Sequence, residues 1–414
     1  MDWLILVESN TTGSGRLFCA RARELGLVPV LFARDPTRYP YVALDGIEHR
    51  VVDTTDVDAV RATGAKLPGR VAGVTSSSEY SIATASEVAR GWGLPHPDPD
   101  AVRACRDKHT QRVRLAEAGV PGPAFGAAAT PDEAVAAAGR IGLPVVVKPV
   151  AGSGSIGVRR CASLAEVAAA ASAVLDVDPV TLALPPQRAV VVEEYLVGDE
   201  YSVETLDTTI VGITRKYLGP EPYFVETGHD FPAVLPVGER SAIGGAAVAA
   251  LRALGLGWGA AHVELRHRAT AGAGEARIVE VNPRLAGGMI PRMVAEATGI
   301  DMIDFMVARA AGRASVPRPT RYRSAAIRFL VAPADGRFDG VDWLDEARAR
   351  PGVVEVGLVR EPGQDIVLTH SFRDRLGYVI AGGGSGAEAA RAAEAGMRTL
   401  QVRMSYATEG SSVP

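Results

Sequence analysis

Three polar side chains alternate with apolar residues near the middle of the chain. Glu280, Asn282 and Arg284 lie in a β-branched stretch that predicts a strand, so all three should project from one face. Glu264 lies in a second predicted strand, and a glycine-rich turn separates the two. Mg²⁺ prefers hard oxygen ligands, often shared with substrate phosphates. Glu264, Glu280 and Asn282 are therefore predicted metal ligands; the alternative is two amphipathic strands with solvated acids.

Lysine is rare in this chain, which makes its positions informative. The 44 Lys and Arg residues include only Lys66, Lys108, Lys148 and Lys216 as lysines. A lysine kept against such a bias indicates a need for a compact point charge on a flexible stem. Lys148 ends an apolar run that predicts a buried strand, and a Gly/Ser loop follows at 151–158. The Walker pattern is absent, but such a loop can bring backbone N–H groups onto a phosphate.

The segment 189–200 is a third candidate for ligand binding. An apolar strand runs into two acids and an aromatic residue, and a Gly-Asp turn then leads to Glu200. An extended backbone presents C=O and N–H groups that can pair with the edge of a purine. A carboxylate a few residues later can accept hydrogen bonds from ribose hydroxyls.

Taken in order, these elements resemble the ATP-grasp superfamily over about residues 95–315. The resemblance rests on Lys108, the Val-Val-Lys148-Pro run with its Gly/Ser loop, Glu-Glu-Tyr-Leu at 193–196, Gly-x-Glu at 198–200, Glu264, and Glu280-x-Asn282-x-Arg284. Within the superfamily, residues 223–232, 282–288 and 375–381 are similar to the L-amino-acid ligase branch of the carboxylate–amine ligases.

The resemblance implies ATP as the cofactor and a role for each matching residue. The two lysines would hold the phosphates, the serine loop would close over them, segment 193–196 would contact adenine, with Glu193 near its amino group, and Glu200 would bind the ribose. The implied nucleotide-binding residues are Lys108, Lys148, Ser153, Ser155, Glu193, Glu194, Tyr195, Leu196 and Glu200.

The same resemblance implies Mg²⁺, or Mn²⁺ in its place, on Glu264, Glu280 and Asn282. Arg284 would steady the transferred phosphoryl group, Glu226 would pair with a substrate ammonium, and His229 would position or deprotonate the amine. Two glycines after Arg284 leave space for a sizeable side chain. The implied catalytic residues are Lys148, His229 and Arg284, and the implied substrate residues are Glu226, His229, Arg284, Gly287 and Gly288. The alternative for Glu226 and His229 is a loop acid and a surface histidine.

The expected fold class is α/β (α+β), with an ATP-grasp fold in three parts. These are a Rossmann-like N-terminal domain (1–95), a linker helix with the lid subdomain (96–188), and a large subdomain with a C-terminal α+β portion (189–414). The elements expected are strands at 3–7, 28–33 and 71–75 and helices at 16–25, 78–91, 131–141, 163–175 and 387–402, then a polar tail predicted to be disordered. Gly13-x-Gly15 lacks the third glycine of a dinucleotide fingerprint and predicts a structural turn.

Composition limits the partners and the compartment. A net charge of −4 gives no electrostatic footprint for nucleic acid. Three cysteines without CxxC spacing predict a reducing cytoplasm and no metal cluster. No apolar run long enough for a membrane span or secretory signal occurs, so no membrane partner is expected. The oligomeric state is left open between monomer and homodimer, since relatives are often dimers.

The sequence therefore predicts an ATP-dependent ligase that activates the carboxylate of an amino acid as an acyl-phosphate and joins it to a second amino acid. A γ-glutamyl ligase or another biosynthetic amide ligase is the alternative within the same chemistry. A regulator that binds ATP without catalysis is the alternative from another class, although all the metal ligands and Arg284 are present. A dehydrogenase built on the N-terminal region is disfavoured by the incomplete fingerprint.

Overall fold

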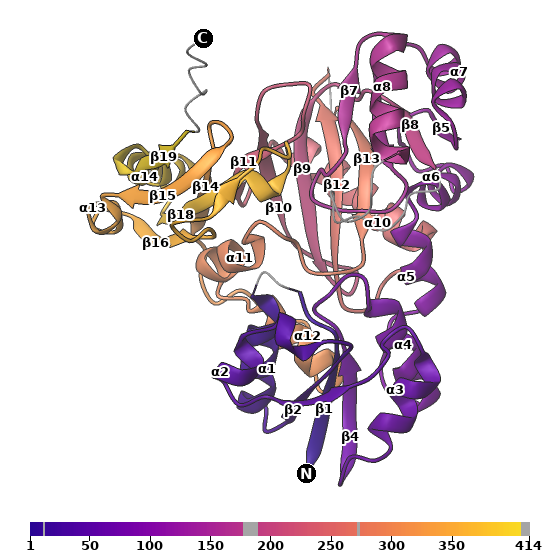
Figure 1. Cartoon of the computed structure of the whole chain (residues 1–414), viewed down its shortest axis with the longest axis vertical. Helices are drawn as coiled ribbons and strands as arrows, with labels where there is room; N and C mark the ends of the chain where they lie inside the picture. The colour runs from indigo at the N-terminus through magenta and orange to yellow at the C-terminus, as the bar shows by residue number, and fades with distance from the viewer. Residues whose placement is uncertain (11–12, 177–188, 271–273, 407–414) are drawn as a thin grey trace, which may run out of the picture.

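Four sheets organise the chain in the computed structural model, which describes residues 1–10, 13–176, 189–270 and 274–406. In Figure 1 the N-terminal domain lies at the bottom, the lid at the upper right, a long central sheet between them, and the C-terminal portion at the left. The expected mixed α/β architecture is confirmed. None of the described helices is long and apolar enough to span a bilayer.

The N-terminal domain is a parallel sheet in the order β3-β2-β1-β4. Residues 3–7 are all buried, as expected for a central parallel strand covered on both faces. Its elements are β1 (Asp2–Val7), α1 (Ser14–Glu24), β2 (Val28–Ala33), η1 (Pro36–Arg38), α2 (Tyr41–Leu44), β3 (Glu48–Val51), α3 (Val57–Gly64), β4 (Arg70–Thr75) and α4 (Ile82–Gly91).

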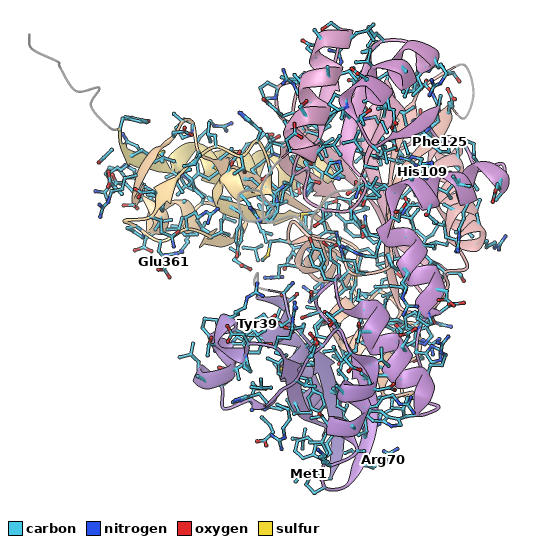
Figure 2. The ribbon with its side chains drawn as sticks, turned by 45° about the vertical axis from the view of Figure 1, so that its right-hand side comes forward. Met1, Tyr39, Arg70, His109, Phe125 and Glu361 are labelled. Atoms are coloured by element: carbon cyan, nitrogen blue, oxygen red, sulfur yellow. The ribbon has the colours of Figure 1, made fainter. Side chains whose placement is uncertain are left out.

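A linker of two helices, α5 (Pro99–Arg106) and α6 (Lys108–Glu117), leads to the lid. The ring of His109 in α6 packs edge-on against Phe125, with centroids 5.8 Å apart (Figure 2). The lid sheet has the order β5-β8-β6-β7, and its alanine-rich helices bury small side chains against it. The lid elements are β5 (Phe125–Ala128), α7 (Pro131–Ile141), β6 (Val145–Pro149), β7 (Arg159–Cys161), α8 (Leu164–Leu175) and β8 (Val190–Glu194).

The central sheet is antiparallel and has the order β13-β12-β9-β10-β11-β14-β18-β16. Its strands are β9 (Asp199–Leu206), β10 (Thr209–Leu218), β11 (Glu226–Phe231), β12 (Ala260–Arg268), β13 (Glu275–Asn282), β14 (Ser324–Val331), β16 (Val353–Leu358) and β18 (Arg375–Gly383). The helices that pack against it include α10 (Val237–Ala253), α11 (Ile290–Thr298) and α14 (Gly386–Thr399). The next helix, α12 (Met302–Ala310), returns to the N-terminal domain and packs on α1 and β4.

The C-terminal portion adds a small sheet in the order β17-β15-β19. Its elements are β15 (Gly336–Asp342), α13 (Leu344–Arg348), β17 (Asp365–Ile366), η2 (Phe372–Asp374) and β19 (Gln401–Ser405). Phe338 is fully buried in its core. Cys19, Cys105 and Cys161 are buried as free thiols.

Several expected boundaries differ from the structure. The final helix was predicted to run to residue 402, but it ends at Thr399 and residues 401–405 form β19, so that end of the prediction was wrong. The extended conformation of Leu400 ends the helix before the chain pairs with β15. Helix α4 begins at Ile82 rather than at residue 78. The large subdomain was placed from residue 189, whereas β8 is hydrogen-bonded into the lid sheet.

The other domain boundaries stay predictions. The tail after residue 402 was predicted to be disordered, but residues 403–405 belong to β19, so that part of the prediction was wrong. Residues 407–414 of the tail lie outside the described residues, and so does part of the glycine-rich turn at 269–274.

Strand β13 is an edge strand, and α6 covers its free edge with side chains. The amide of Gln111 donates to Val281 O at 2.8 Å and accepts from Val281 N at 2.9 Å. The guanidinium of Arg112 donates to the carbonyls of Ile278 and Val279. These side chains take the place of a neighbouring strand and satisfy buried backbone groups that would otherwise be unpaired.

Replacing Gln111 by Leu should lower the free energy of unfolding by about 1–3 kcal/mol, because two buried backbone groups of Val281 lose their partner. The urea midpoint, followed by circular dichroism, measures the change. Gln401→Leu, at an exposed position in β19, is the control and should leave the midpoint unchanged. Equal midpoints for the two variants would contradict the role of Gln111 at the edge.

Candidate functional site

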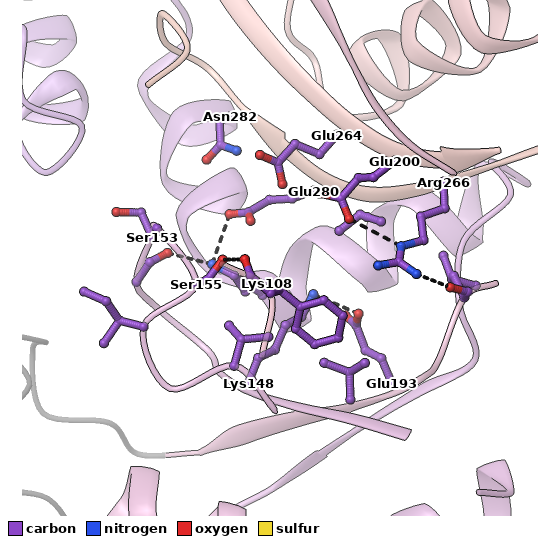
Figure 3. Close-up of a pocket in the computed structure, with 18 of the residues that line it drawn as sticks. Lys108, Lys148, Ser153, Ser155, Glu193, Glu200, Glu264, Arg266, Glu280 and Asn282 are labelled. Carbon is purple, nitrogen blue, oxygen red and sulfur yellow. Dashed lines mark hydrogen bonds and ion pairs between the residues drawn. The ribbon is translucent and has the colours of Figure 1, made fainter. Parts of the chain in front are cut away.

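A pocket opens between the lid sheet and the central sheet, and the predicted residues converge on it. Figure 3 shows Glu264, Glu280 and Asn282 together on one side and the loop with Ser153 and Ser155 facing them. The predicted residues that line the pocket are Lys108, Lys148, Ser153, Ser155, Glu193, Glu194, Tyr195, Leu196, Glu200, Glu226, Glu264, Glu280, Asn282 and Arg284. His229, Gly287 and Gly288 are not part of this lining.

The register of β12 and β13 places the predicted metal ligands on one face. Glu264 lies directly opposite Glu280, and His262 lies opposite Asn282. Residues paired across antiparallel strands project to the same face of a sheet. Arg284 lies beyond the end of β13, so its position comes from the turn after the strand rather than from strand alternation.

The donor set fits a magnesium ion that shares its ligands with phosphates. Glu264, Glu280 and Asn282 offer carboxylate and amide oxygens, the ligand type that Mg²⁺ prefers. Within the described parts of the chain, no group of three or more His, Cys, Asp or Glu side chains is arranged to hold a metal by itself. The remaining ligands would therefore have to come from a bound nucleotide or from water.

Lys148 is buried at the end of β6 against a carboxylate. Its Nζ lies 2.8 Å from Glu193 Oε2, and Arg112 Nε lies 2.6 Å from the other oxygen of Glu193. Burial lowers the pKa of Lys148 to about 8, although the charge of Glu193 opposes the shift. Burial acts to raise the pKa of Glu193, but Arg112 and Lys148 outweigh it and bring the pKa to about 2. Glu193 was expected near an adenine amino group, and the structure places its carboxylate between these two cations.

Lys108, at the start of α6, joins the glycine loop to the metal-ligand face. Its Nζ donates to Gly152 O at 2.7 Å and lies 3.0 Å from Glu280 Oε1. In the same loop, Ser155 Oγ donates to Phe224 O at 2.9 Å. The loop therefore lies across the pocket in a closed arrangement.

The segment 194–200 lines the pocket and is held by arginine and lysine side chains. The carboxylate of Glu194 pairs with Arg277 at 2.6 Å, and Leu196 O accepts from Arg266 Nη1 at 2.8 Å. Glu200 lies between Arg266 and Lys216, at 3.3 and 3.2 Å. Tyr195 has Arg266 against its ring, with the guanidinium carbon 5.3 Å from the ring centroid.

Lys216 in β10 is the buried cation at the centre of the site. Its Nζ lies 2.6 Å from Glu226, 2.8 Å from Glu264 and 3.2 Å from Glu200. Burial acts to lower its pKa, but the three carboxylates, Glu226 first, raise the pKa well above its usual value. The sequence singled out Lys216 by its rarity without assigning it a role, because its partners come from three other strands.

His262 was missed by the sequence analysis and extends the same network. Its two ring nitrogens face Glu204 at 3.0 Å and Glu264 at 2.9 Å. Burial acts to lower the pKa of His262, but Glu204 and then Glu264 raise it to about 9. Burial acts to raise the pKa of Glu264, and the charges of Lys216 and His262 instead hold that pKa far below its usual value.

Of the residues predicted for the amino-acid site, Glu226 and Arg284 line the pocket, whereas His229, Gly287 and Gly288 do not. His229 Nε2 lies 3.6 Å from Glu226 Oε2, and a Cβ on Gly288 would lie 2.7 Å from that nitrogen. Arg375 reaches Glu226 at 2.7 Å from the C-terminal portion. Gly287 has open space where a Cβ would be. His229 is fully buried in β11, which excludes the alternative of a surface histidine.

Burial of its ring lowers the pKa of His229 to about 3, against the opposing charge of Glu226. Neither ring nitrogen has a hydrogen-bond partner among the described residues. The imidazole is therefore neutral at physiological pH.

Arg284 is paired with the N-terminal domain, which the sequence did not predict. Its Nε lies 2.6 Å from Glu79 Oε2, and Arg106 lies 3.4 Å from the same oxygen. Burial acts to raise the pKa of Glu79, but Arg284 and then Arg106 outweigh it and lower the pKa to about 2. The carboxylate of Glu79 thus fixes the guanidinium in the lining of the pocket.

Comparison with known proteins agrees with this geometry. Residues 141–292 match the ATP-grasp domain family, and residues 328–405 match the L-amino acid ligase C-terminal domain 2. The uncharacterized protein y4rH of Sinorhizobium fredii is 38% identical over 380 residues, which cover 91% of this chain and 78% of that protein. D-alanine–D-alanine ligase of Ralstonia pickettii is 28% identical, over 53% of this chain and 67% of the enzyme.

Among solved structures, the L-amino acid ligase of Bacillus licheniformis superposes with a TM-score of 0.78 at 23% identity. The superposition covers 98% of this chain and 99% of that one. The expected ATP-grasp fold is confirmed.

Affinity for a non-hydrolysable ATP analogue should fall as pH rises above about 8, because the predicted contact of Lys148 with phosphate needs the positive charge of that side chain. The loss should approach tenfold per pH unit above that point. Calorimetric titration from pH 6.5 to 9.5 measures it. Glu193→Gln should move the onset to lower pH, whereas Lys66→Met, an exposed lysine, should not. A dissociation constant that is flat up to pH 9.5 would contradict this role.

Proposed function

We propose that this chain, which belongs to the ATP-grasp family of ATP-dependent ligases and carries an L-amino acid ligase C-terminal domain, joins two amino acids through an amide bond. The observation that carries the proposal is the pocket in which Glu264 and Glu280 oppose each other between Lys108 and Lys216. Two carboxylates flanked by buried cations suit a magnesium-bound triphosphate better than any neutral ligand. ADP and phosphate would be the other products.

The reaction needs the carboxylate of one amino acid to become a better electrophile. Transfer of the γ-phosphoryl group of ATP to that carboxylate gives an acyl-phosphate, and attack by the second amine then expels phosphate. Mg²⁺, held by Glu264, Glu280 and Asn282, would neutralise charge on the phosphates during the transfer. We propose that the positive side chains of Lys108, Lys148 and Arg284 also point at the phosphate oxygens and stabilise their charge.

Preorganisation supports these assignments. Each of the three proposed cations is already paired with a carboxylate: Lys108 with Glu280, Lys148 with Glu193, and Arg284 with Glu79. Side chains held in this way need little rearrangement when negative charge develops on a transferring group, which is the condition for strong electrostatic stabilisation. The glycine loop at 152–157 would exclude water from the acyl-phosphate, which water would otherwise hydrolyse.

His229 is better suited to position the amine than to deprotonate it. A group with a pKa of about 3 is a weak base and cannot efficiently take a proton from an ammonium group. A neutral ring nitrogen can still accept a hydrogen bond from a bound ammonium. We propose that His229 and Glu226 together hold the amino group of one substrate, with Glu226 fixed by Lys216 and Arg375.

The alternatives make different predictions. A γ-glutamyl or other biosynthetic amide ligase would use the same nucleotide site with a different carboxylate substrate. A regulator without catalysis would be expected to have lost a metal ligand or Arg284. The convergence of Glu264, Glu280, Asn282 and Arg284 on one pocket weighs against it.

Phosphate release with Mg-ATP should depend on amino acids when the twenty L-amino acids are tested singly and in pairs. A product lighter by one water than the sum of a pair, identified by mass spectrometry, would establish the ligase and its substrates. Release that is identical with and without amino acids, across the whole panel, would contradict the proposal.

Glu280→Gln should lower kcat about a hundredfold or more, because the substitution removes a charged ligand and a partner of Lys108. Glu275→Gln, at an exposed position on the same strand, is the matched control and should retain activity. Equal rates for the two variants would overturn the assignment of Glu280.

A further inference from the structure

Three residues of the glycine loop contact three separate parts of the molecule outside the lid. Gly152 O accepts from Lys108 of the linker helix α6. The next residue, Ser153, hydrogen-bonds through its side chain to Glu79 of the N-terminal domain. Ser155 Oγ donates to the carbonyl of Phe224, which precedes β11 of the central sheet. The closed loop is therefore hydrogen-bonded to the linker helix, to the N-terminal domain and to the segment that leads into the central sheet.

Gly154 makes the remaining contact, with the C-terminal portion. A Cβ at this position would lie 2.3 Å from Cδ1 of Phe372, so the backbone of the loop rests directly on the phenyl ring. Its φ of +68° lies in the region that favours glycine. Phe372 N also donates to Gly154 O, at 3.4 Å. A side chain at residue 154 would move the loop away from the ring.

The segment that presents Phe372 is held rigidly. The buried carboxylate of Asp374 accepts from Thr369 N at 2.8 Å and from Ser371 N at 3.2 Å. Ser371 in turn caps the short helix η2 through its hydroxyl, and it is fully buried. Residues 369–374, named here the C-terminal clasp, thus form a preorganised surface rather than a free loop.

The clasp also contacts the segment that leads into strand β11 of the central sheet. The ring of His370 stacks on Tyr223 with centroids 3.8 Å apart and planes 5° from parallel. Tyr223 precedes Phe224, whose carbonyl accepts from Ser155. Stacked aromatic pairs contribute about 0.5–1.5 kcal/mol beyond the area they bury. The glycine loop therefore contacts both Phe224 and Phe372, and the segments that carry these residues are stacked on each other.

We propose that the C-terminal clasp holds the glycine loop closed over the nucleotide, with Phe372 as a positioning residue that acts through Gly154. This inference rests on the proposed function, because it assigns the closed loop to an ATP site. The C-terminal portion contributes none of the proposed metal or phosphate ligands. Besides Arg375, which fixes Glu226, its part in catalysis is to fix the loop that excludes water. Loops of this kind must open for nucleotide exchange, and the contacts that close them set its rate.

The first test measures release of a fluorescent non-hydrolysable ATP analogue with Mg²⁺ by stopped flow. Phe372→Ala should raise the dissociation rate about tenfold, the effect of losing one aromatic contact in the closed state, with the association rate unchanged. Val367→Ala, at an exposed position in the same portion, is the control. Phe372→Leu keeps an apolar side chain and should fall between the two; it serves as the test variant if Phe372→Ala does not fold.

A double-mutant cycle separates loop closure from general stability. Gly154→Ala alone should speed release more than Phe372→Ala does, because the new methyl group meets the ring. Removing the ring as well should recover part of the loss, so Gly154→Ala with Phe372→Ala should release the analogue more slowly than Gly154→Ala alone. Strictly additive effects, or an unchanged release rate in Phe372→Ala and Phe372→Leu, would overturn the proposal.

The release experiment does not depend on amide formation. Wild-type protein that binds the analogue but shows no amino-acid-dependent phosphate release would refute the proposed function, while the release rates would still decide the role of the clasp. With an active ligase, Phe372→Ala should also raise the ratio of phosphate released to amide formed, because water reaches the acyl-phosphate. An unchanged ratio together with faster release would contradict the water-excluding part of the proposal.

Discussion

The site depends on one constraint: the buried carboxylates on strands β9, β11 and β12 must be neutralised by a buried cation on β10. Glu226, Glu264 and Glu200 come from three different strands, and all of them lie within 3.2 Å of the single ammonium group of Lys216. An uncompensated buried charge costs several kcal/mol, so removing this lysine would leave carboxylates that repel one another. The register of the sheet is what brings these groups together, since Lys216 lies opposite Glu200 in β9 and opposite His229 in β11.

The same compensation joins the parts of the molecule to one another. Glu193 of the lid sheet is neutralised by Arg112 of the linker helix, and that arginine also covers the free edge of β13. Arg284, beyond the end of β13, is neutralised by Glu79 of the N-terminal domain. Both of these charged contacts cross a boundary between parts. A pocket built in this way responds to the relative positions of its parts, which suits a site that must close during the reaction.

Local patterns in the sequence predicted the elements and most of the pocket. The apolar run before Lys148, the acids of segment 193–200 and the alternation around Glu280 each needed only strand periodicity to be interpreted. Partners that come from distant strands could not be predicted in this way. His262 looks like an ordinary strand residue until β9 brings Glu204 against it, and Glu79 looks like a surface acid until Arg284 reaches it. The strand β19 was missed because its polar–apolar alternation spans only five residues and directly follows a strongly helical run.

Formation of an acyl-phosphate is the central chemical claim, and oxygen transfer tests it most directly. An amino-acid substrate labelled with ¹⁸O in its carboxylate would be incubated with Mg-ATP and the second amino acid, and the phosphate released would be analysed by mass spectrometry or by ³¹P NMR. The account predicts one labelled oxygen in the phosphate for each amide bond formed, and none in the ADP. Amide formation with unlabelled phosphate, or with label in a nucleotide product, would contradict it.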